Sequence, residues 1–402
     1  MPDVTIGLIG YGYWGPNLLR NYMDLPTADV KWVCDSREDR LEKAATRYPS
    51  VNTTTDARAV LDDPDVDAVL IATPISSHHS LAMEVLAAGK HVFVEKPMAM
   101  TVGQCDEMCE AATAGGLTLM VGHTFVYSPP VRAVKKILES GELGEVRFIT
   151  CSRVNLGLHQ KDVSVVWDLA PHDLSILAYW LGETPLSVQA MGRSCIANGM
   201  PDVAFLNVRY SSGIIAELEV SWLSPVKLRR TVIVGSKKML MYDDTESVEK
   251  VKIFDQGVDY KDPETFGEFQ LSYRTGGIYS PKVENTEPLY LEASHFVDCI
   301  TNGDTPLTDG LSGRLVVAAL EAAQNSLDGC TNAPTERRGR VERRTAPRAC
   351  SAIPVLAPSR PVRRGDIAFP RGPARKRGIP APCQSGCTCQ VAVRATARGR
   401  VR

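Results

Sequence analysis

The chain has 402 residues, of which 44% are hydrophobic and 23% are charged, and its formal net charge is −2. This length allows two domains with a sizeable hydrophobic core. No run of about 18 apolar residues occurs, and the first residues lead directly into a strand-like segment, so we predict neither a membrane span nor a signal peptide.

The charge is unevenly distributed along the chain. Residues 331–402 contain 17 Lys+Arg and 3 Asp+Glu, whereas the preceding 330 residues contain 28 Lys+Arg and 44 Asp+Glu. The basic segment is rich in Pro, Arg, Ala and Gly and lacks periodicity, which predicts a disordered tail. An out-of-frame reading of GC-rich coding DNA is an alternative explanation for this composition. A nucleic-acid-binding arm is a further alternative, but Phe369 is its only aromatic residue, and we do not favour it.

The cysteines give no metal signature. The chain has 11 cysteines, and those of the first 330 residues form no C-x-x-C pair. Cys383, Cys387 and Cys389 have neither a histidine nor a fourth ligand nearby, so we predict no metal site. Unpaired cysteines of this kind fit a reducing cytoplasm.

A glycine-rich turn follows the first apolar run. Val4–Ile9 leads into Gly10-x-Gly12-x-x-Gly15, and a helix-like stretch, residues 16–23, comes next. In such turns the first glycine permits a tight bend, the second allows close approach of a pyrophosphate, and the third lets helix and strand pack closely. The helix N-terminus then offers free N–H groups to the anion. The pattern predicts a dinucleotide site rather than an ordinary turn.

The second apolar run predicts the type of dinucleotide. Val30–Cys34 ends at Asp35, 20 residues after Gly15, where an acidic residue is expected to bind the adenosine ribose. Its charge disfavours a 2′-phosphate. Arg37 could accommodate that phosphate or lie over the adenine. We predict NAD as cofactor, with NADP as the alternative.

Further alternation of strands and helices predicts a parallel sheet in residues 1–124. A buried strand over residues 66–72 ends at Thr73-Pro74, and the segment through His78 should face the cofactor, because ligands bind beyond the carboxyl ends of parallel strands. The other elements expected here are a helix over 38–48, a helix over 79–88, a strand over 91–94 followed by Glu95-Lys96-Pro97, a helix over 102–114 and a strand over 117–121.

From residue 125 the pattern indicates an α+β domain extending to residue 330, with an open and mainly antiparallel sheet. Its last helix is expected to pack back on the first domain. Residues 255–288 are rich in turn formers and predict a long loop. The expected helices cover 131–140, 167–179, 290–301 and 311–327, and the expected strands cover 145–155, 186–197, 203–210, 214–222, 230–234 and 238–242.

Lys96, Asp168 and His172 are the candidate catalytic residues. Asp168 and His172 are four apart, so they share one helix face, where the carboxylate could orient the imidazole. Oxidation of a secondary alcohol requires a base for the hydroxyl proton, which suits His172. It also requires a group that stabilises the developing oxyanion, which suits Lys96. On spacing alone, a solvated helix face with a lone histidine is equally consistent with this pattern.

Four motifs together resemble the glucose–fructose oxidoreductase / inositol dehydrogenase / MocA family. They are Gly10-x-Gly12-x-x-Gly15, Ala72-Thr73-Pro74 with His78, Ala88-Gly89-Lys90-His91-Val92 leading into Glu95-Lys96-Pro97, and Asp168-x-x-x-His172-Asp173. The resemblance runs from residue 4 to about residue 328. It implies a Rossmann domain followed by an α+β domain whose sheet forms a dimer or tetramer interface. It also implies that Lys96 contacts substrate and cofactor, that Asp168 and His172 are the catalytic pair, and that the bond before Pro97 is cis.

The chain departs from the family pattern in two places. The run from Thr124 to Pro129 replaces the usual Arg or Asn, aromatic and Asn-Pro sequence, and Ala170-Pro171 stands where a Gly and a variable residue are usual. The glycine-rich turn is similar to that of members acting on nucleotide sugars. The expected cofactor contacts are Gly10, Gly12, Tyr13, Trp14, Gly15, Asp35, Arg37, Thr73, Pro74, His78, Glu95 and Lys96. The expected substrate-lining residues are His123, Tyr127, Arg153, Asn155, Trp167 and Tyr279.

The sequence therefore predicts a cytoplasmic, homo-oligomeric NAD(P)-dependent oxidoreductase acting on a secondary alcohol of a sugar, cyclitol or nucleotide sugar. Reduction of a keto-sugar with NADPH, in deoxysugar biosynthesis, is the enzymatic alternative. A dinucleotide-sensing regulator without catalysis is the non-enzymatic one. Joint retention of Lys96, Asp168 and His172 favours an enzyme.

Overall fold

A computed structural model describes residues 3–157, 159, 163–196, 199–260 and 271–329. The predictions of a disordered tail and of no metal site at Cys383, Cys387 and Cys389 fall outside these residues. Within the described ranges, no helix has the length and apolar character needed to cross a bilayer.

The first sheet is parallel throughout and has the strand order β3-β2-β1-β4-β5-β6. The order reverses between β1 and β4, so their carboxyl ends form the crevice where dinucleotides bind in this type of sheet. All four residues of β4 are buried, as expected for a strand covered on both faces. The strands are β1 (Val4–Ile9), β2 (Ala28–Cys34), β3 (Asn52–Thr54), β4 (Ala68–Ile71), β5 (His91–Glu95) and β6 (Leu119–Gly122).

The ends of the helices in this half are explained by the residues found there. The first of them, α1, has Pro16 in its first turn, where the missing N–H has no cost. The fifth, α5, is capped by the Thr101 side chain, which accepts from the Gln104 N–H, and it ends at the left-handed Gly116. These elements are α1 (Gly15–Met23), α2 (Glu38–Arg47), α3 (Ala57–Leu61), η1 (Ile75–Ser77), α4 (His78–Ala87) and α5 (Val102–Gly115).

The second sheet has the order β14-β13-β12-β11-β7-β10-β9-β8, and within it only β7 and β10 pair in parallel. The predicted fold class, a Rossmann domain with a mainly antiparallel second sheet, is therefore confirmed. The strands are β7 (Val146–Leu156), β8 (Pro185–Arg193), β9 (Val203–Tyr210), β10 (Ile215–Ser221), β11 (Leu223–Gly235), β12 (Met239–Asp243), β13 (Val251–Tyr260) and β14 (Leu271–Tyr279).

The prediction of a long loop over residues 255–288 is wrong. Most of β13 and all of β14 lie in that range and pair antiparallel. The edge strand β14 has no buried residue, so it owes its structure to backbone pairing with β13 rather than to an apolar face. A strand formed in this way leaves no hydrophobic periodicity in the sequence.

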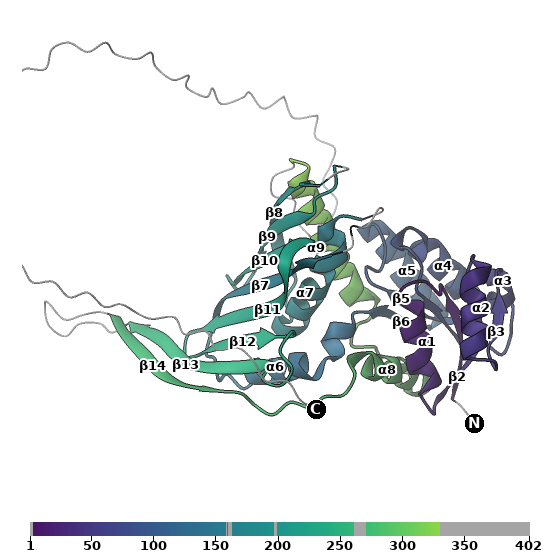
Figure 1. Cartoon of the computed structure of the whole chain (residues 1–402), viewed down its shortest axis with the longest axis horizontal. Helices are drawn as coiled ribbons and strands as arrows, with labels where there is room; N and C mark the ends of the chain where they lie inside the picture. Colours follow the sequence, from purple (N-terminus) through teal and green to yellow (C-terminus); the bar gives the residue numbers. More distant parts are fainter. Residues whose placement is uncertain (1–2, 158, 160–162, 197–198, 261–270, 330–402) are drawn as a thin grey trace, which may run out of the picture. The chain divides into compact units, whose positions relative to one another are not determined.

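The remaining helices connect the two sheets (Figure 1). One face of the second sheet is covered by α7, which also packs against α9, and α9 packs in turn on α5 and β6 of the first half. Near the glycine-rich turn, α8 packs on α1 and β1. These elements are η2 (Thr124–Tyr127), α6 (Pro129–Glu139), α7 (Val165–Leu181), α8 (Pro288–Asn302) and α9 (Gly310–Leu327).

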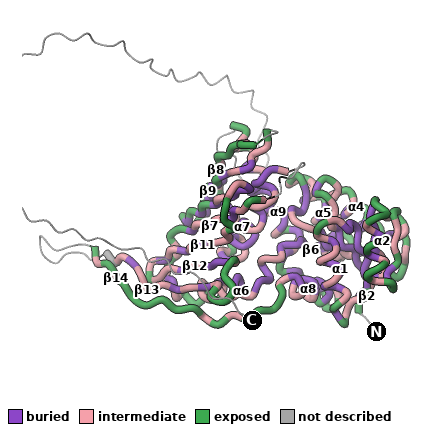
Figure 2. The backbone as a smooth tube through the Cα atoms, in the orientation of Figure 1, coloured by how far each residue is buried: buried purple, intermediate pink, exposed green. Residues whose placement is uncertain are grey.

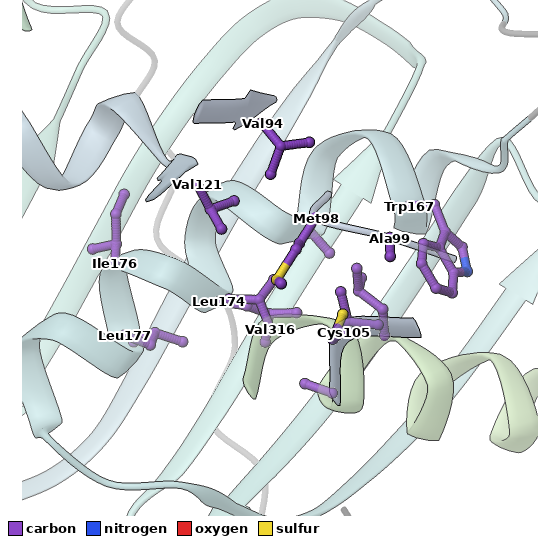
Figure 3. Packing of buried hydrophobic residues seen from close by; sticks show 14 of the residues in the cluster. Val94, Met98, Ala99, Cys105, Val121, Trp167, Leu174, Ile176, Leu177 and Val316 are labelled. Carbon is purple, nitrogen blue, oxygen red and sulfur yellow. The ribbon is translucent and has the colours of Figure 1, made fainter. Parts of the chain in front are cut away.

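One continuous core runs from the ends of β5 and β6 to α7 and α9. Met98 follows the Glu-Lys-Pro motif and is fully buried, among residues that include Val121, Leu174 and Val316, and Figure 3 shows these side chains together. The absence of a side chain at Gly313 lets α9 approach Met98 and Val121 closely. Figure 2 shows the contrast between this buried core and the largely exposed β14. Burial of Met98 thus anchors the segment that carries Lys96.

Candidate functional site

The glycine-rich turn has the geometry that a pyrophosphate requires. Gly10 has a φ of +102° and approaches the backbone of Ala72, while a side chain at Gly15 would collide with the Gly10 carbonyl. The N-terminus of α1 has no side-chain cap among the described residues, and Tyr13 beside it is 89% exposed. A bend, a close backbone approach and an uncapped helix N-terminus together fit a dinucleotide phosphate.

Asp35 joins the turns that follow β1 and β2. Its carboxylate accepts the backbone N–H of Tyr11 at 2.7 Å and that of Arg37 at 3.0 Å, and it pairs with the Arg40 guanidinium at 3.1 Å. Asp35 is 4% exposed. The carboxylate that is predicted to bind the ribose is thus held in place by three donors.

Arg40, which sequence reasoning missed, lies closer to the predicted adenosine position than Arg37 does. The Arg37 guanidinium is turned outward, where it binds the Asp39 carboxylate at 2.9 and 2.8 Å. The Arg40 guanidinium lies over Gly12, 3.5 Å from the point a Cβ would occupy. The sequence feature that could have identified Arg40 is its position as a basic residue in the first turn of α2, the helix that follows Asp35.

His78 holds two loops of the site together. Its Nδ1 lies 2.9 Å from the Pro97 carbonyl oxygen and its Nε2 lies 2.9 Å from that of Thr73. Burial lowers the pKa of this imidazole. The side chain is therefore a link between the β4 loop, which carries Thr73 and the exposed Pro74, and the turn that carries Lys96. It does not offer a free ring nitrogen to a cofactor.

Lys96 and Asp168 meet although they are 72 residues apart in the chain. The Lys96 ammonium donates to the backbone carbonyl of Asp168 at 3.0 Å and lies 3.5 Å from its carboxylate. The same carboxylate accepts the indole N–H of Trp222 at 3.0 Å. The predicted cis bond between Lys96 and Pro97 is confirmed. The structure thus unites the motifs of the two halves at one point.

His172 is arranged differently from the predicted Asp168–His172 pair. The Asp168 carboxylate is bonded to Lys96 and Trp222, and no described residue hydrogen-bonds the His172 ring. Its neighbour is instead the Phe125 ring, edge-on at a centroid distance of 5.0 Å. Burial and then the positive charges of Lys96, Arg153 and Arg229 hold the pKa of His172 well below its ordinary value. The environment therefore keeps this imidazole neutral.

The cations around His172 come from adjacent strands. Arg153 on β7 and Arg229 on β11 are direct partners in register, and their guanidinium carbons lie 4.6 and 5.5 Å from the centre of the Phe125 ring. Arg153 is buried and binds Asp173 through two hydrogen bonds of 2.9 and 2.8 Å. Sequence reasoning found Arg153 but missed Arg229, Trp222 and Phe125, because their proximity to His172 depends on tertiary packing.

Several predicted lining residues lie elsewhere. Tyr127 is fully buried and its hydroxyl lies 3.1 Å from the Thr308 hydroxyl, so it belongs to the core. Tyr279 is on the edge strand β14 and donates to Glu142 at 2.7 Å. Trp167 is 8% exposed and borders a separate cavity of about 550 Å³ that Gln324 and Asn325 also line. Asn155, two residues beyond Arg153 on β7, is half-buried.

A pair of buried carboxyls lies beneath the site. Burial raises the pKa of Glu95 to about 7. Burial and the charge of Glu95 raise the pKa of Glu292 on α8 well above its usual range, although the Thr124 hydroxyl donates to Glu292 at 2.8 Å. One oxygen of each carboxyl is buried without a partner among the described residues. Glu95, expected to contact the cofactor, thus directs its carboxyl into the protein. No metal-ligand cluster of three His, Cys, Asp or Glu residues occurs in the described ranges.

Comparison with known proteins gives consistent matches. The profile described as the GFO/IDH/MocA oxidoreductase family with an NAD-binding Rossmann fold matches residues 4–123, and that of the GFO/IDH/MocA C-terminal domain matches residues 131–241. The scyllo-inositol 2-dehydrogenase (NAD(+)) of Bacillus subtilis strain 168 is 25% identical over 80% of this chain and 92% of its own length. The D-apiose dehydrogenase of Paraburkholderia graminis is 26% identical over 78% of this chain and 85% of its own length.

A solved structure shares the fold. UDP-N-acetylglucosamine 3-dehydrogenase from Acidithiobacillus ferrooxidans superposes with a TM-score of 0.70 at 23% identity, covering 82% of this chain and 99% of that one.

The contrast between Arg40 and Arg37 predicts which arginine decides cofactor preference. Replacing Arg40 with Ala should weaken NADP binding about tenfold or more, because a charge-assisted hydrogen bond to the 2′-phosphate is worth about 1.5–3 kcal/mol. NAD binding should change less than threefold by the same reasoning. Titration of protein fluorescence with each cofactor measures both affinities. The matched variant Arg37→Ala should leave the affinities for NAD and NADP nearly unchanged. If Arg40→Ala weakened the binding of NAD and NADP equally, Arg40 would instead stack on the adenine.

The buried carboxyl pair predicts a pH-dependent stability. Between the ordinary Glu pKa of 4.5 and the folded value of about 7 for Glu95, the folded chain holds protons that the unfolded chain releases. Stability should therefore fall as pH rises through this window. Glu292→Gln should flatten the decline in melting temperature from pH 4.5 to 7, measured by scanning calorimetry. The exposed control Glu110→Gln should retain the wild-type slope, and an unchanged slope in Glu292→Gln would contradict the assignment.

Proposed function

The chain belongs to the GFO/IDH/MocA family of oxidoreductases, and from this premise we propose that it oxidises a secondary alcohol of a sugar, cyclitol or nucleotide sugar. The observation that carries the proposal is the contact between Lys96 and Asp168 beside a neutral His172. This contact lies beyond the carboxyl ends of the parallel strands, where the fold presents ligands. The relatives named above act on an inositol, a branched sugar and a nucleotide sugar, which supports this substrate class.

The dinucleotide would be held by the glycine-rich turn, by Asp35 after β2 and by Thr73 and Pro74 after β4, with Arg40 of α2 beside Asp35. When bound, NAD supplies the acceptor for the hydride of the substrate's carbinol carbon. Tyr13 lies beside the N-terminus of α1 and is exposed, which supports a contact between its ring and the phosphates.

The reaction requires a base that is neutral before the hydroxyl proton is transferred. His172 meets this condition, since its burial and the neighbouring cations keep its pKa low. His172 takes the hydroxyl proton, and Lys96 stabilises the developing negative charge on that oxygen. An ammonium has three donors, so Lys96 retains N–H groups for the substrate while one binds the Asp168 carbonyl. Asp168 is fixed by Trp222 and holds Lys96 in position.

Keto-sugar reduction with NADPH uses the same groups in the opposite direction. Lys96 then polarises the carbonyl, and a protonated His172 returns the proton. The low pKa of His172 disfavours its protonated form in the free protein, and the direction of net turnover is set by the equilibrium and by the cofactor preference. A regulator that only senses the dinucleotide has no need for a lysine and carboxylate fixed beside a half-buried histidine.

We further propose that the second sheet forms the interface of a homodimer or homotetramer. A row of apolar side chains crosses the face opposite α7 in continuous register, namely Ile215, Phe148, Val234, Met239, Phe254 and Ile278. Phe148 and Ile215 are 45% and 46% exposed. A cytoplasmic location also stays a prediction, which the free cysteines of the described residues support.

The function is tested by following NADH formation from NAD with the full-length protein and a panel of inositols, free sugars and UDP-sugars. We expect turnover with one class. Lys96→Met should bind NAD within threefold of wild type but lower kcat by about 10²–10⁴, because the group that stabilises the oxyanion is lost. The exposed Lys43→Met on α2 serves as the control. Full activity of Lys96→Met would remove Lys96 from the chemistry.

The interface is tested by placing a charge in the apolar row. Phe148→Asp should shift the mass measured by light scattering towards that of one chain, because an unpaired carboxylate buried in an apolar interface is costly. The control Leu311→Asp adds the same charge on α9, at a leucine that is 62% exposed, and should leave the mass unchanged. An assembly that survives Phe148→Asp would exclude this face.

A further inference from the structure

A second cavity lies behind His172, apart from Lys96 and Asp168. It has a volume of about 230 Å³ and is formed by the C-terminal half of α7, the turn after it, the start of α9 and the end of β6. A liquid-water molecule occupies about 30 Å³, so the space admits several. The residues that the argument uses are His123, Ser175, Glu183, Thr308 and Ser312.

His123 is the unexplained group in this cavity. It is 1% exposed, and neither ring nitrogen has a partner among the described residues. A buried imidazole left without hydrogen bonds is costly, and such groups in native proteins are normally satisfied by ordered water. Burial, reinforced by the charge of Lys96, lowers the pKa of His123 to about 3. The ring is therefore neutral and has one donor and one acceptor for water.

The other polar groups of the cavity are suited to hold that water. The hydroxyls of Ser175, Thr308 and Ser312 donate to the carbonyls of His172, Val121 and Asp309 at 2.8, 2.8 and 2.7 Å. Each hydroxyl oxygen thus keeps a lone pair that can accept from water. These oxygens and the His123 ring give the water the several partners that it needs.

The cavity adjoins the helix turn that carries His172. Ser175 is three residues after His172 on α7, so the two lie on the same side of the helix, and the Ser175 hydroxyl binds the His172 carbonyl. On the other side, His123 precedes η2 by one residue, and Phe125 of η2 lies edge-on against the His172 ring at 5.0 Å. The charge of His123, when present, is felt at His172. The two imidazoles are thus electrostatic neighbours, and Ser175 and His123 border the same cavity.

We propose that this cavity is the exit for the proton that His172 removes, and that His123 transfers it to the enclosed water. The inference rests on the proposed function. In each oxidation the substrate loses a hydride to NAD⁺ and its hydroxyl proton to His172, so that one proton must reach solvent for every carbonyl formed. Burial and the charges of Lys96, Arg153 and Arg229 disfavour a proton that stays on His172.

His123 can pass the proton without storing its charge. Enclosed water carries the proton from His172 to one ring nitrogen of His123 as the proton on the other nitrogen leaves to water, so the ring ends neutral and in its other tautomer. The far end of the cavity is bordered by Glu183, which accepts hydrogen bonds from Ser211 and Ser212 at 3.0 and 3.1 Å. These bonds lower the pKa of Glu183 although burial opposes them, so this carboxylate stays negative and attracts the proton outward.

The test compares His123→Phe with wild type in the full-length protein, using the substrate found in the panel above. NADH absorbance and a pH indicator in weak buffer are followed together in stopped flow. In wild type the two signals should rise together. In His123→Phe, proton release should lag behind NADH formation and should slow by about a hundredfold. Added imidazole at about 50 mM should restore turnover, because it replaces the missing proton-transfer group. The control His79→Phe removes a histidine on α4 and should match wild type.

Two results would overturn the proposal. Synchronous signals at the wild-type rate in His123→Phe would place the exit elsewhere, and a slow variant that imidazole does not rescue would give His123 a structural role. A crystal structure of the wild-type chain provides a readout without substrate, and ordered water bonded to His123 is expected. A dry cavity would refute the exit even if the enzyme is active. Failure of wild type to oxidise any compound refutes the proposed function instead, and it appears before any variant is made.

Discussion

The contact between Lys96 and Asp168 is the constraint on which the site depends, because it joins segments 72 residues apart. Lys96 directly follows β5 of the parallel sheet, and Asp168 lies in the first turn of α7, which packs on the second sheet. Neither partner could hold this position alone. Met98 anchors the lysine side through its burial in the shared core, and Trp222 anchors the aspartate side through its indole N–H.

The sequence was sufficient to predict those parts of the structure that depend on neighbouring residues in the chain. The glycine turn could be predicted because Gly10 and Gly15 have no room for a side chain, and Lys96 could be predicted because it follows a buried strand. The edge strand β14 could not be predicted, since it forms by backbone pairing and its sequence shows no apolar pattern. Arg40 was missed for a related reason. Only the fold of α2 onto the glycine turn reveals that its guanidinium, and not that of Arg37, lies over Gly12.

The spacing of Asp168 and His172 shows how a correct local inference can lead to a wrong contact. The two residues do share a helix, but a carboxylate bonds to the donors that tertiary structure brings to it. Here those donors are Lys96 and Trp222, which belong to other elements. The resemblance to the family pointed to Lys96 and Asp168, which the structure brings into contact, whereas the partners of each carboxylate had to come from the structure. Arg153 illustrates the same point, because its guanidinium binds the carboxylate of Asp173, which lies 20 residues away in the chain.

A base without a carboxylate partner is a consistent choice for the oxidation of an alcohol. A hydrogen-bonded carboxylate would raise the pKa of His172. A larger fraction of His172 side chains would then already be protonated before the reaction. Burial beside cations has the opposite effect and keeps the imidazole ready to accept. The same cations then destabilise the imidazolium that forms, so the proton must leave quickly for the base to be regenerated. A base of low pKa therefore requires a route to water, and the polar groups of the cavity beside α7 are arranged as such a route requires.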